Sequence, residues 1–491
     1  MSLAKNSAYN FFFRLVTAVS TLGTSVAVGR ILGPETAGIY SLLFWAISVA
    51  VMMSTLGLPS GLTKHVSEYA QREDQITIRQ IVSRSLLLAL GLSAIASLIF
   101  YLLIFAGVIY LNVPQLVAAL AIAAIPGVAV TNLMTGVLQG LGRFRTLLHI
   151  NLFAGPANFV LTLAVLMKGY GLTGLIVLNL FYTLAVSLAT GYALRDRLEW
   201  KTSRPEPSLI LRFRHYALAM SGIVLLDMIV WQKSEILFLS IYSGAKEIAY
   251  YSIAYTLISR LMVLLPGSVS GVLLPYISAF HGEGAMAKIE ATYYKTTRYL
   301  ALMTLPIIAS GIALANPLIE SLYGPTYRPM APVLSLLLFS GGLAALVAPA
   351  PAVVYGTNRQ DFNLKLSSVV AVLNLALDLA IIPKYGAIGA AMANGTAQLI
   401  GIPFGLRYLS RHFKLAFPWR DTFKIGLAAG LAGLLVHWIV AGSYLGGLAA
   451  LAAGGSLFAL LYLIAILLFR VINEDDRAVL AHMINIGAPP S

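Results

Sequence analysis

The sequence predicts an all-α polytopic membrane protein, and three observations support this prediction. Of the 491 residues, 59% are hydrophobic and 11% are charged, whereas an ordinary soluble domain carries roughly 25% charged residues. The apolar stretches are long and continuous, as spanning helices require, and lack the period-two alternation of barrel strands. Basic residues also alternate between successive loops. A soluble multidomain enzyme and a membrane barrel are therefore excluded.

Fourteen transmembrane helices can be placed along the chain, because a helix needs about 20 apolar residues to cross the hydrocarbon core. The loops between them are mostly short, and none is long enough for a separate soluble domain. We expect the spans to be centred near Val19, Ser48, Ser97, Ala124, Phe159, Leu184, Ile229, Val263, Pro306, Phe339, Val372, Ala397, Leu431 and Leu457.

The positions of lysine and arginine predict the topology. If the N-terminus is cytoplasmic, most of the 33 basic residues fall in cytoplasmic segments, while Lys233 and Arg260 remain inside spans. This bias predicts that both termini are cytoplasmic, and it explains the net charge of +14 without nucleic-acid binding. The predicted outside loops hold only Arg30, Lys168, Lys246, Arg328 and Lys384.

Three short motifs recur in the same order and at nearly constant spacing. Because each copy covers six spans, an even number, the two copies have the same orientation in the membrane. The sequence therefore predicts two like-oriented six-helix bundles plus two extra C-terminal helices. The matching segments are 33–41 with 244–252, 140–143 with 356–359, and 170–174 with 385–389.

This repeat divides the chain into four parts. Residues 1–195 form an N-lobe of spans one to six, and residues 196–211 form a cytoplasmic linker. Residues 212–411 form a C-lobe of spans seven to twelve, and residues 412–491 hold spans thirteen and fourteen and a cytoplasmic tail. Two like-oriented bundles are typical of a transporter, and a duplicated scaffold without a pore is the alternative.

Polar residues inside spans are the candidate functional residues, because a bilayer makes them costly. Asn10 and Arg14 share one face of span one, and we expect this face to line a water-filled cavity. The alternative is that the Arg14 side chain snorkels to the cytoplasmic interface. Asn374 and Asp378 share a face of span eleven. Asp378 either binds a coupling cation or proton, or is a buried structural carboxyl.

Spans seven and eight add further charges. Asp227, Lys233 and Glu235 lie in span seven, where a structural salt bridge is the alternative to a functional role. Arg260 lies deep in span eight, two turns before Pro266. A guanidinium binds phosphate bidentately, so Arg260 is a candidate ligand-contacting or gating residue.

Missing motifs narrow the chemistry further. The chain has no cysteine, no phosphate-binding glycine loop and no His-Glu-x-x-His motif. We therefore expect no disulfide, no ATP-driven pump, no cofactor and no metal site. The chain is not expected to be an enzyme, although an intramembrane lipid-processing enzyme is an alternative from another class.

The segment from Gly29 to Ser41 resembles the first loop of polysaccharide-biosynthesis (Wzx-type) flippases of the multidrug/oligosaccharidyl-lipid/polysaccharide exporter superfamily. In these proteins the loop commonly reads as an arginine, a leucine-glycine-proline and a glycine-hydrophobic-tyrosine-serine. The segment 260–278 is similar to that of lipid II flippases, in which its arginine belongs to a central cation cluster. The arginine-aspartate end of their first helix is missing here, which argues against a peptidoglycan substrate.

The resemblance implies a flippase that works by alternating access in the cell (cytoplasmic, inner) membrane. Its cargo would be a polyprenyl- or dolichyl-(pyro)phosphate-linked oligosaccharide, moved from the cytoplasmic to the outer leaflet. A proton or a sodium ion is the expected coupling ion, membrane lipids are the other partners, and a monomer is expected. A drug/cation antiporter of the same superfamily and a lipid II flippase are the alternatives.

Flipping requires cations for the phosphate and polar or aromatic groups for the sugars. Arg14, Lys233 and Arg260 are the candidates for the phosphate. The ion-coupling candidates are Asp227, Glu235 and Asp378. The candidates for the sugars are Asn10, Asn158, Asn374, Tyr251 and Tyr255.

Overall fold

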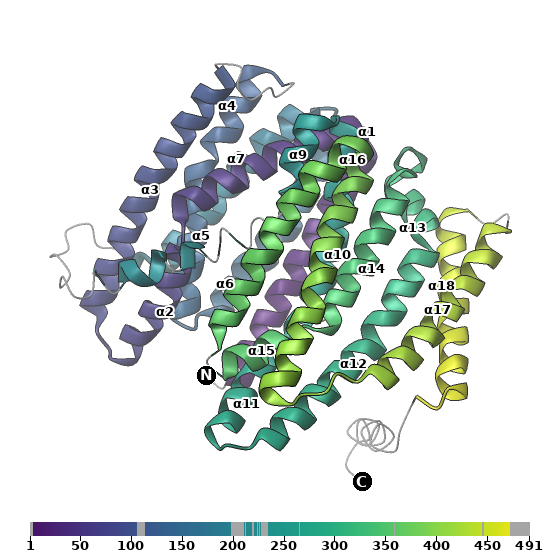
Figure 1. Ribbon diagram of the computed structural model, residues 1–491. Coiled ribbons are helices and arrows are strands. Elements are labelled where there is room, and N and C mark those ends of the chain that lie inside the picture. Colours follow the sequence, from purple (N-terminus) through teal and green to yellow (C-terminus); the bar gives the residue numbers. More distant parts are fainter. Residues whose placement is uncertain are drawn as a thin grey trace, which may run out of the picture. The chain divides into compact units, whose positions relative to one another are not determined.

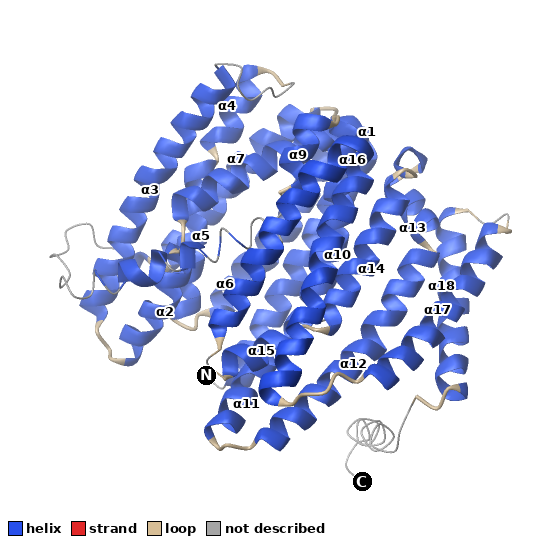
Figure 2. Cartoon of the chain, in the orientation of Figure 1, coloured by secondary structure: helices blue, strands red, loops and turns tan. Residues whose placement is uncertain are grey.

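The computed structural model describes most of the chain, and its regular structure there is entirely helical (Figure 2). Nine of the described helices are long and apolar enough to cross a membrane, or up to ten if one bent pair counts as a single span. The predicted all-helical class is confirmed, and the count of fourteen stays a prediction. The described residues are 3–105, 113–197, 211, 213–218, 220–222, 224, 226, 234–264, 266–357, 359–443 and 446–471.

The backbone forms two compact units. The first contains Met1–Leu257 and Ala371–Ala390, and the second contains Ile258–Val370 and Ala391–Ser491. The limits of these units differ from the predicted lobe boundaries, and the arrangement as two like-oriented bundles stays a prediction.

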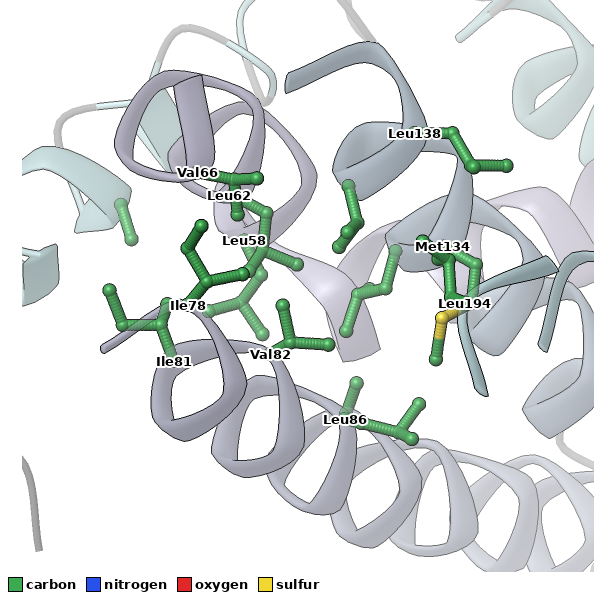
Figure 3. Packing of buried hydrophobic residues seen from close by; sticks show 14 of the residues in the cluster. Leu58, Leu62, Val66, Ile78, Ile81, Val82, Leu86, Met134, Leu138 and Leu194 are labelled. Atoms are coloured by element: carbon green, nitrogen blue, oxygen red, sulfur yellow. The ribbon is translucent and has the colours of Figure 1, made fainter. Parts of the chain in front are cut away.

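In the first unit, α1 lies along α6 and α2 packs against α5 (Figure 1). A cluster of leucine, isoleucine and valine side chains fills the space between α2, α3 and α5 (Figure 3). The unit holds α1 (Leu3–Thr55), α2 (Leu58–Gln71), α3 (Gln75–Phe105), α4 (Gln115–Ala123), α5 (Ile125–Gly140), α6 (Phe144–Met167), α7 (Gly171–Ala193), η1 (Arg195–Arg197), α9 (Glu235–Tyr242) and most of α10 (Ala245–Leu264).

In the second unit, α12 packs against α14 and α17, and α17 packs against α18. The buried Arg298 guanidinium fixes this group, because it pairs with Asp421 at 3.2 Å and donates to the Val471 carbonyl at 2.7 Å. The unit holds α11 (Pro266–Gly282), α12 (Met286–Ala313), α13 (Ala315–Tyr323), η2 (Pro325–Tyr327), α14 (Met330–Leu346), α15 (Pro349–Gly356), α17 (Trp419–Ala441) and α18 (Gly447–Leu468); α16 (Gln360–Phe413) is shared between the units.

Two very long helices are interrupted at glycine. The 53-residue α1 leaves helical geometry at Gly33 (φ 75°, ψ 171°), and the 54-residue α16 does so at Gly386 (φ 52°, ψ −131°). Both glycines adopt positive φ, which residues with a Cβ rarely adopt. Each helix is longer than the roughly 20 residues that one span needs, and each interruption leaves two pieces of sufficient length.

The repeated motifs lie at matching breaks. Gly33 interrupts α1, and its counterpart Gly244 lies between α9 and α10. Gly171 begins α7 with φ 56°, and its counterpart Gly386 interrupts α16 with φ 52°. The same sequence signal therefore ends a helix in both copies, which is what a structural duplication requires.

The two copies of the first motif also contact each other. A Cβ at Gly38 would collide with the carbonyl oxygen of Ala245, so α1 and α10 approach closely there. Lys246 Nζ lies 3.7 Å from Glu35 Oε2, and the repeat assigns these two residues to equivalent positions. Both are exposed, so the pair contributes at most about 1 kcal/mol, but it marks where the two copies meet.

Candidate functional site

Four buried polar residues join α9 to α16 in what we call the carboxylate network: Ser234, Glu235, Asn374 and Asp378. Neither Glu235 nor Asp378 has any exposed surface. Asn374 Nδ2 donates to Glu235 Oε1 and Asp378 Oδ2, both at 3.2 Å, and lies 3.3 Å from Ser234 Oγ. The Ser234 hydroxyl also donates to Asp378 Oδ2 at 3.2 Å. One amide thus links both carboxyl groups.

Local helix geometry places these side chains together. Asn374 and Asp378 are four residues apart, so they lie one above the other on a face of α16. Ser234 and Glu235 stand together at the start of α9. Two of the three predicted ion-coupling residues, Glu235 and Asp378, therefore lie in one network, and Asn374 joins them.

The carboxylate network is suited to holding a proton or a small cation. Two charged carboxylates in one buried cluster repel each other, and a positive charge between them removes this repulsion. Asp378 Oδ1 accepts no hydrogen bond from any described residue, so it has a free lone pair for such a charge. The available ligands are oxygen atoms, which hard cations prefer. Across the described ranges, no cluster of three or more His, Asp or Glu side chains of the kind that holds a metal ion is present.

Tyrosines from α10 form a wall beside the carboxylate network. Tyr251 is fully buried and Tyr255 is half-buried, with ring centroids 5.8 Å apart. Both rings lie within electrostatic reach of Glu235. The structure thus places these two predicted sugar ligands next to the carboxyl groups.

Arg260 lies in the later part of α10, which belongs to the second unit. Its side chain is half-buried, and its buried Nε has no hydrogen-bond partner among the described residues. A buried guanidinium N–H without an acceptor is costly, so an anionic ligand would be stabilised here.

Asn158 lies apart from the carboxylate network, in a groove of about 490 Å³ between α6 and α7. The rings of Phe153, Phe181 and Tyr182 line the same groove. An amide together with aromatic rings can contact the polar edge and the apolar face of a sugar. The groove thus places the predicted sugar ligand Asn158 beside aromatic rings, and the rest of its described lining is aliphatic.

Four predicted residues cannot be placed. Asp227 and Lys233 lie outside the described residues. Asn10 and Arg14 belong to the backbone of α1, but their side chains lie outside the described part.

Two residues of the site were missed by the sequence analysis. Ser234 directly precedes Glu235, and a hydroxyl beside an intramembrane acid was the available signal. Glu247 lies within the second motif copy, and its Oε2 accepts the Ala387 backbone N–H at 2.7 Å, beside the Gly386 interruption. A carboxylate at the free N–H groups of a new helical segment is favourable, so Glu247 stabilises the break.

The comparisons agree with the resemblance in the first loop. A protein of Shigella flexneri named as an O-antigen transporter is 23% identical over 417 residues, which is 80% of this chain and 94% of that protein. A protein of Haloferax volcanii named as the flippase AglR is 20% identical over 209 residues, 42% of this chain. The match spans less than half of that archaeal relative, 44% of its length.

A solved structure of the lipid II flippase MurJ, in an inward closed conformation, shares the fold. Its TM-score is 0.75 at 16% identity, and the match covers 95% of this chain and 99% of MurJ. A family model described as "Polysaccharide biosynthesis protein" matches residues 27–332, more than half of the chain. The predicted resemblance is thus confirmed, and the chain belongs to the polysaccharide biosynthesis protein family.

Proposed function

We propose that this protein flips a lipid-(pyro)phosphate-linked oligosaccharide from the cytoplasmic to the outer leaflet by alternating access. The lipid tail of such a cargo can stay in hydrocarbon, whereas the phosphate and sugars need a polar path. The names of the Shigella and Haloferax relatives support this cargo class.

One observation carries the cargo assignment: the buried Nε of Arg260 has no acceptor among the described residues. A phosphate offers the planar guanidinium two parallel hydrogen bonds, and an organic cation offers none. Arg260 therefore favours an anionic cargo over the cationic drugs of an antiporter. Asn158 and the aromatic groove between α6 and α7 would contact the sugars.

The carboxylate network is the proposed coupling site. Glu235 and Asp378 would bind a proton or a sodium ion, and Asn374 would hold their orientation by its hydrogen bonds to both. We thus assign Asn374 to ion coupling rather than to the sugars. Because the network joins α9 to the part of α16 that precedes the break at Gly386, occupation by a cation can change how these segments pack.

The topology proposed with this function has fourteen spans and both termini in the cytoplasm. The breaks at Gly33 and Gly386, which divide α1 and α16, support counting each helix as two spans. The alternation of basic loops supports the orientation.

An Arg260 series tests the cargo assignment. Purified Arg260→Ala should bind polyprenyl diphosphate at least tenfold more weakly than wild type, because a charge-assisted pair is lost. Arg260→Lys should recover only part of the affinity, since ammonium lacks the planar fork. Arg411→Ala, which removes an exposed arginine of α16, is the matched control. Unchanged binding by Arg260→Ala would make Arg260 structural.

A further inference from the structure

A second cavity, of about 430 Å³, lies in the first unit between α3 and the described residues 213–218 and 220–221. Leucines of α3 form one wall, and Phe213, Ala217 and Leu218 form the other. None of the residues of the carboxylate network lines it. It therefore needs a separate explanation.

The wall formed by residues 213–218 and 220–221 contacts the junction of α1 and α2. The Gly57 backbone N–H donates to Ser221 Oγ at 2.9 Å, and a Cβ at Gly57 would collide with the Ala217 carbonyl oxygen. Lys64 Nζ lies 4.0 Å from the centroid of the Tyr216 ring. The segment is thus fixed against the junction of α1 and α2, and the cavity has defined walls.

The cavity floor belongs to the hydrophobic core. Leu58 and Ile81 line the cavity and are also members of the packed cluster in Figure 3. A ligand in this cavity would therefore rest on a close-packed surface rather than on a mobile loop.

Two arginines provide the charge in this apolar cavity. Arg84 comes from α3 and Arg214 from the opposite segment. Neither Arg84 nor Arg214 makes a hydrogen bond or an ion pair with another described residue, and none of the described lining residues is acidic. Two cations at one apolar cavity suit a phosphate group.

The mouth of the cavity, where its lining is exposed, is mostly apolar. Leu87, Leu88 and Leu218 are 51%, 52% and 58% exposed, so in a membrane protein they face hydrocarbon, and Arg214 is the exposed charged residue of the lining. Among the described lining residues, Ser85 and Ser221 are the uncharged polar ones, and Ser221 already bonds to backbone groups. The lining thus suits an anionic headgroup with an acyl chain and offers little to a sugar.

We propose that this cavity binds an anionic phospholipid of the surrounding bilayer. Its phosphate lies between Arg84 and Arg214, and an acyl chain covers the leucines of α3. The bound lipid bridges α3 to residues 213–218 and 220–221 and stabilises their packing. This proposal does not depend on the identity of the cargo.

The test compares two lipids with identical acyl chains on delipidated full-length protein in a non-ionic detergent. Native mass spectrometry should show phosphatidylglycerol retained and phosphatidylcholine lost, and only phosphatidylglycerol should raise the melting temperature. The double variant Arg84→Gln/Arg214→Gln should weaken phosphatidylglycerol binding by about tenfold or more. Leu88→Trp, which obstructs the mouth without changing charge, should also weaken it.

The matched control is Arg145→Gln/Arg411→Gln, which removes the same charge from exposed arginines outside the cavity that make no ion pair with a described residue. It should bind phosphatidylglycerol like wild type. The proposal is overturned if both lipids bind equally, or if the control loses as much affinity as the cavity variant. It is also overturned if inorganic phosphate stabilises the protein as well as phosphatidylglycerol does, or if polyprenyl phosphate displaces the phospholipid, which would make the cavity a cargo site.

Discussion

Substitution of Asp378 by asparagine separates ion coupling from folding. Asp378 Oδ2 accepts hydrogen bonds from Ser234 and Asn374, whereas Oδ1 has no partner among the described residues. An asparagine can place its carbonyl oxygen at the Oδ2 position and its amide at the Oδ1 position. Both hydrogen bonds then survive, and only the negative charge is lost.

The expected loss of stability and the expected loss of cation affinity differ in size. A hydrogen bond to a charged group contributes about 1.5–3 kcal/mol and one between neutral groups about 1 kcal/mol, so Asp378→Asn should cost about 2 kcal/mol of stability across its two bonds. A unit charge about 4 Å from a cation contributes on the order of 4 kcal/mol at an effective dielectric constant of about 20. Cation affinity should therefore fall by roughly tenfold to a thousandfold, while the fold remains intact.

The assay is transport in proteoliposomes under an imposed proton or sodium gradient, with cargo binding measured separately. Asp378→Asn should abolish gradient-driven transport and leave cargo binding nearly unchanged. Asp361→Asn, at an exposed position in the first turn of the same helix, is the control and should transport like wild type. Unchanged transport by Asp378→Asn across a range of pH and sodium would show that Asp378 does not couple transport to an ion and is a structural carboxyl.

Three further changes test the surrounding structure. Gly38→Ala should cost about 1–3 kcal/mol in thermal unfolding, because its Cβ collides with Ala245; an unchanged melting temperature would contradict that close approach. Arg298→Ala should cost about 2–3 kcal/mol by the same measurement, since a buried charged donor is lost. Asp74 directly precedes α3 and caps its N-terminus, because its carboxylate accepts hydrogen bonds from the Thr77 hydroxyl and backbone N–H. These bonds hold the pKa of Asp74 below its ordinary value. The cap therefore stabilises α3 at neutral pH, and this contribution is lost as the pH falls through the folded-state pKa. Asp74→Ala should cost about 1 kcal/mol at neutral pH and nothing in strong acid, and an equal cost at both pH values would contradict the cap.

Several features of the fold could be predicted from residue patterns, because they depend on local chemistry. The length of the apolar stretches predicted the helices, and the repeated glycine motifs coincide with the breaks at Gly33, Gly171, Gly244 and Gly386. Spacing placed Asn374 and Asp378 on one face of α16. The periodicity of a helix fixes such relations within one element.

Contacts between elements could not be predicted in the same way. The sequence marked Glu235 and Asp378 as separate candidates, but no pattern indicated that Asn374 would bond to both. Nor did any pattern predict that Glu247 would accept the Ala387 N–H at the break in α16. These pairings depend on how distant segments pack, and the periodicity within a single element does not encode that packing.

The most direct test of the central claim is whether the protein itself moves a lipid-linked sugar. A fluorescent polyprenyl-diphosphate-linked saccharide is reconstituted with purified protein in liposomes, and a membrane-impermeant quencher reports the fraction in each leaflet. Wild-type protein should make the inner-leaflet pool accessible to the quencher, Arg260→Ala should do so at a small fraction of that rate, and ethidium should not be transported under the same gradient. Failure to flip the lipid-linked saccharide, together with gradient-driven ethidium transport, would rule out the proposed flippase function and identify a cation antiporter.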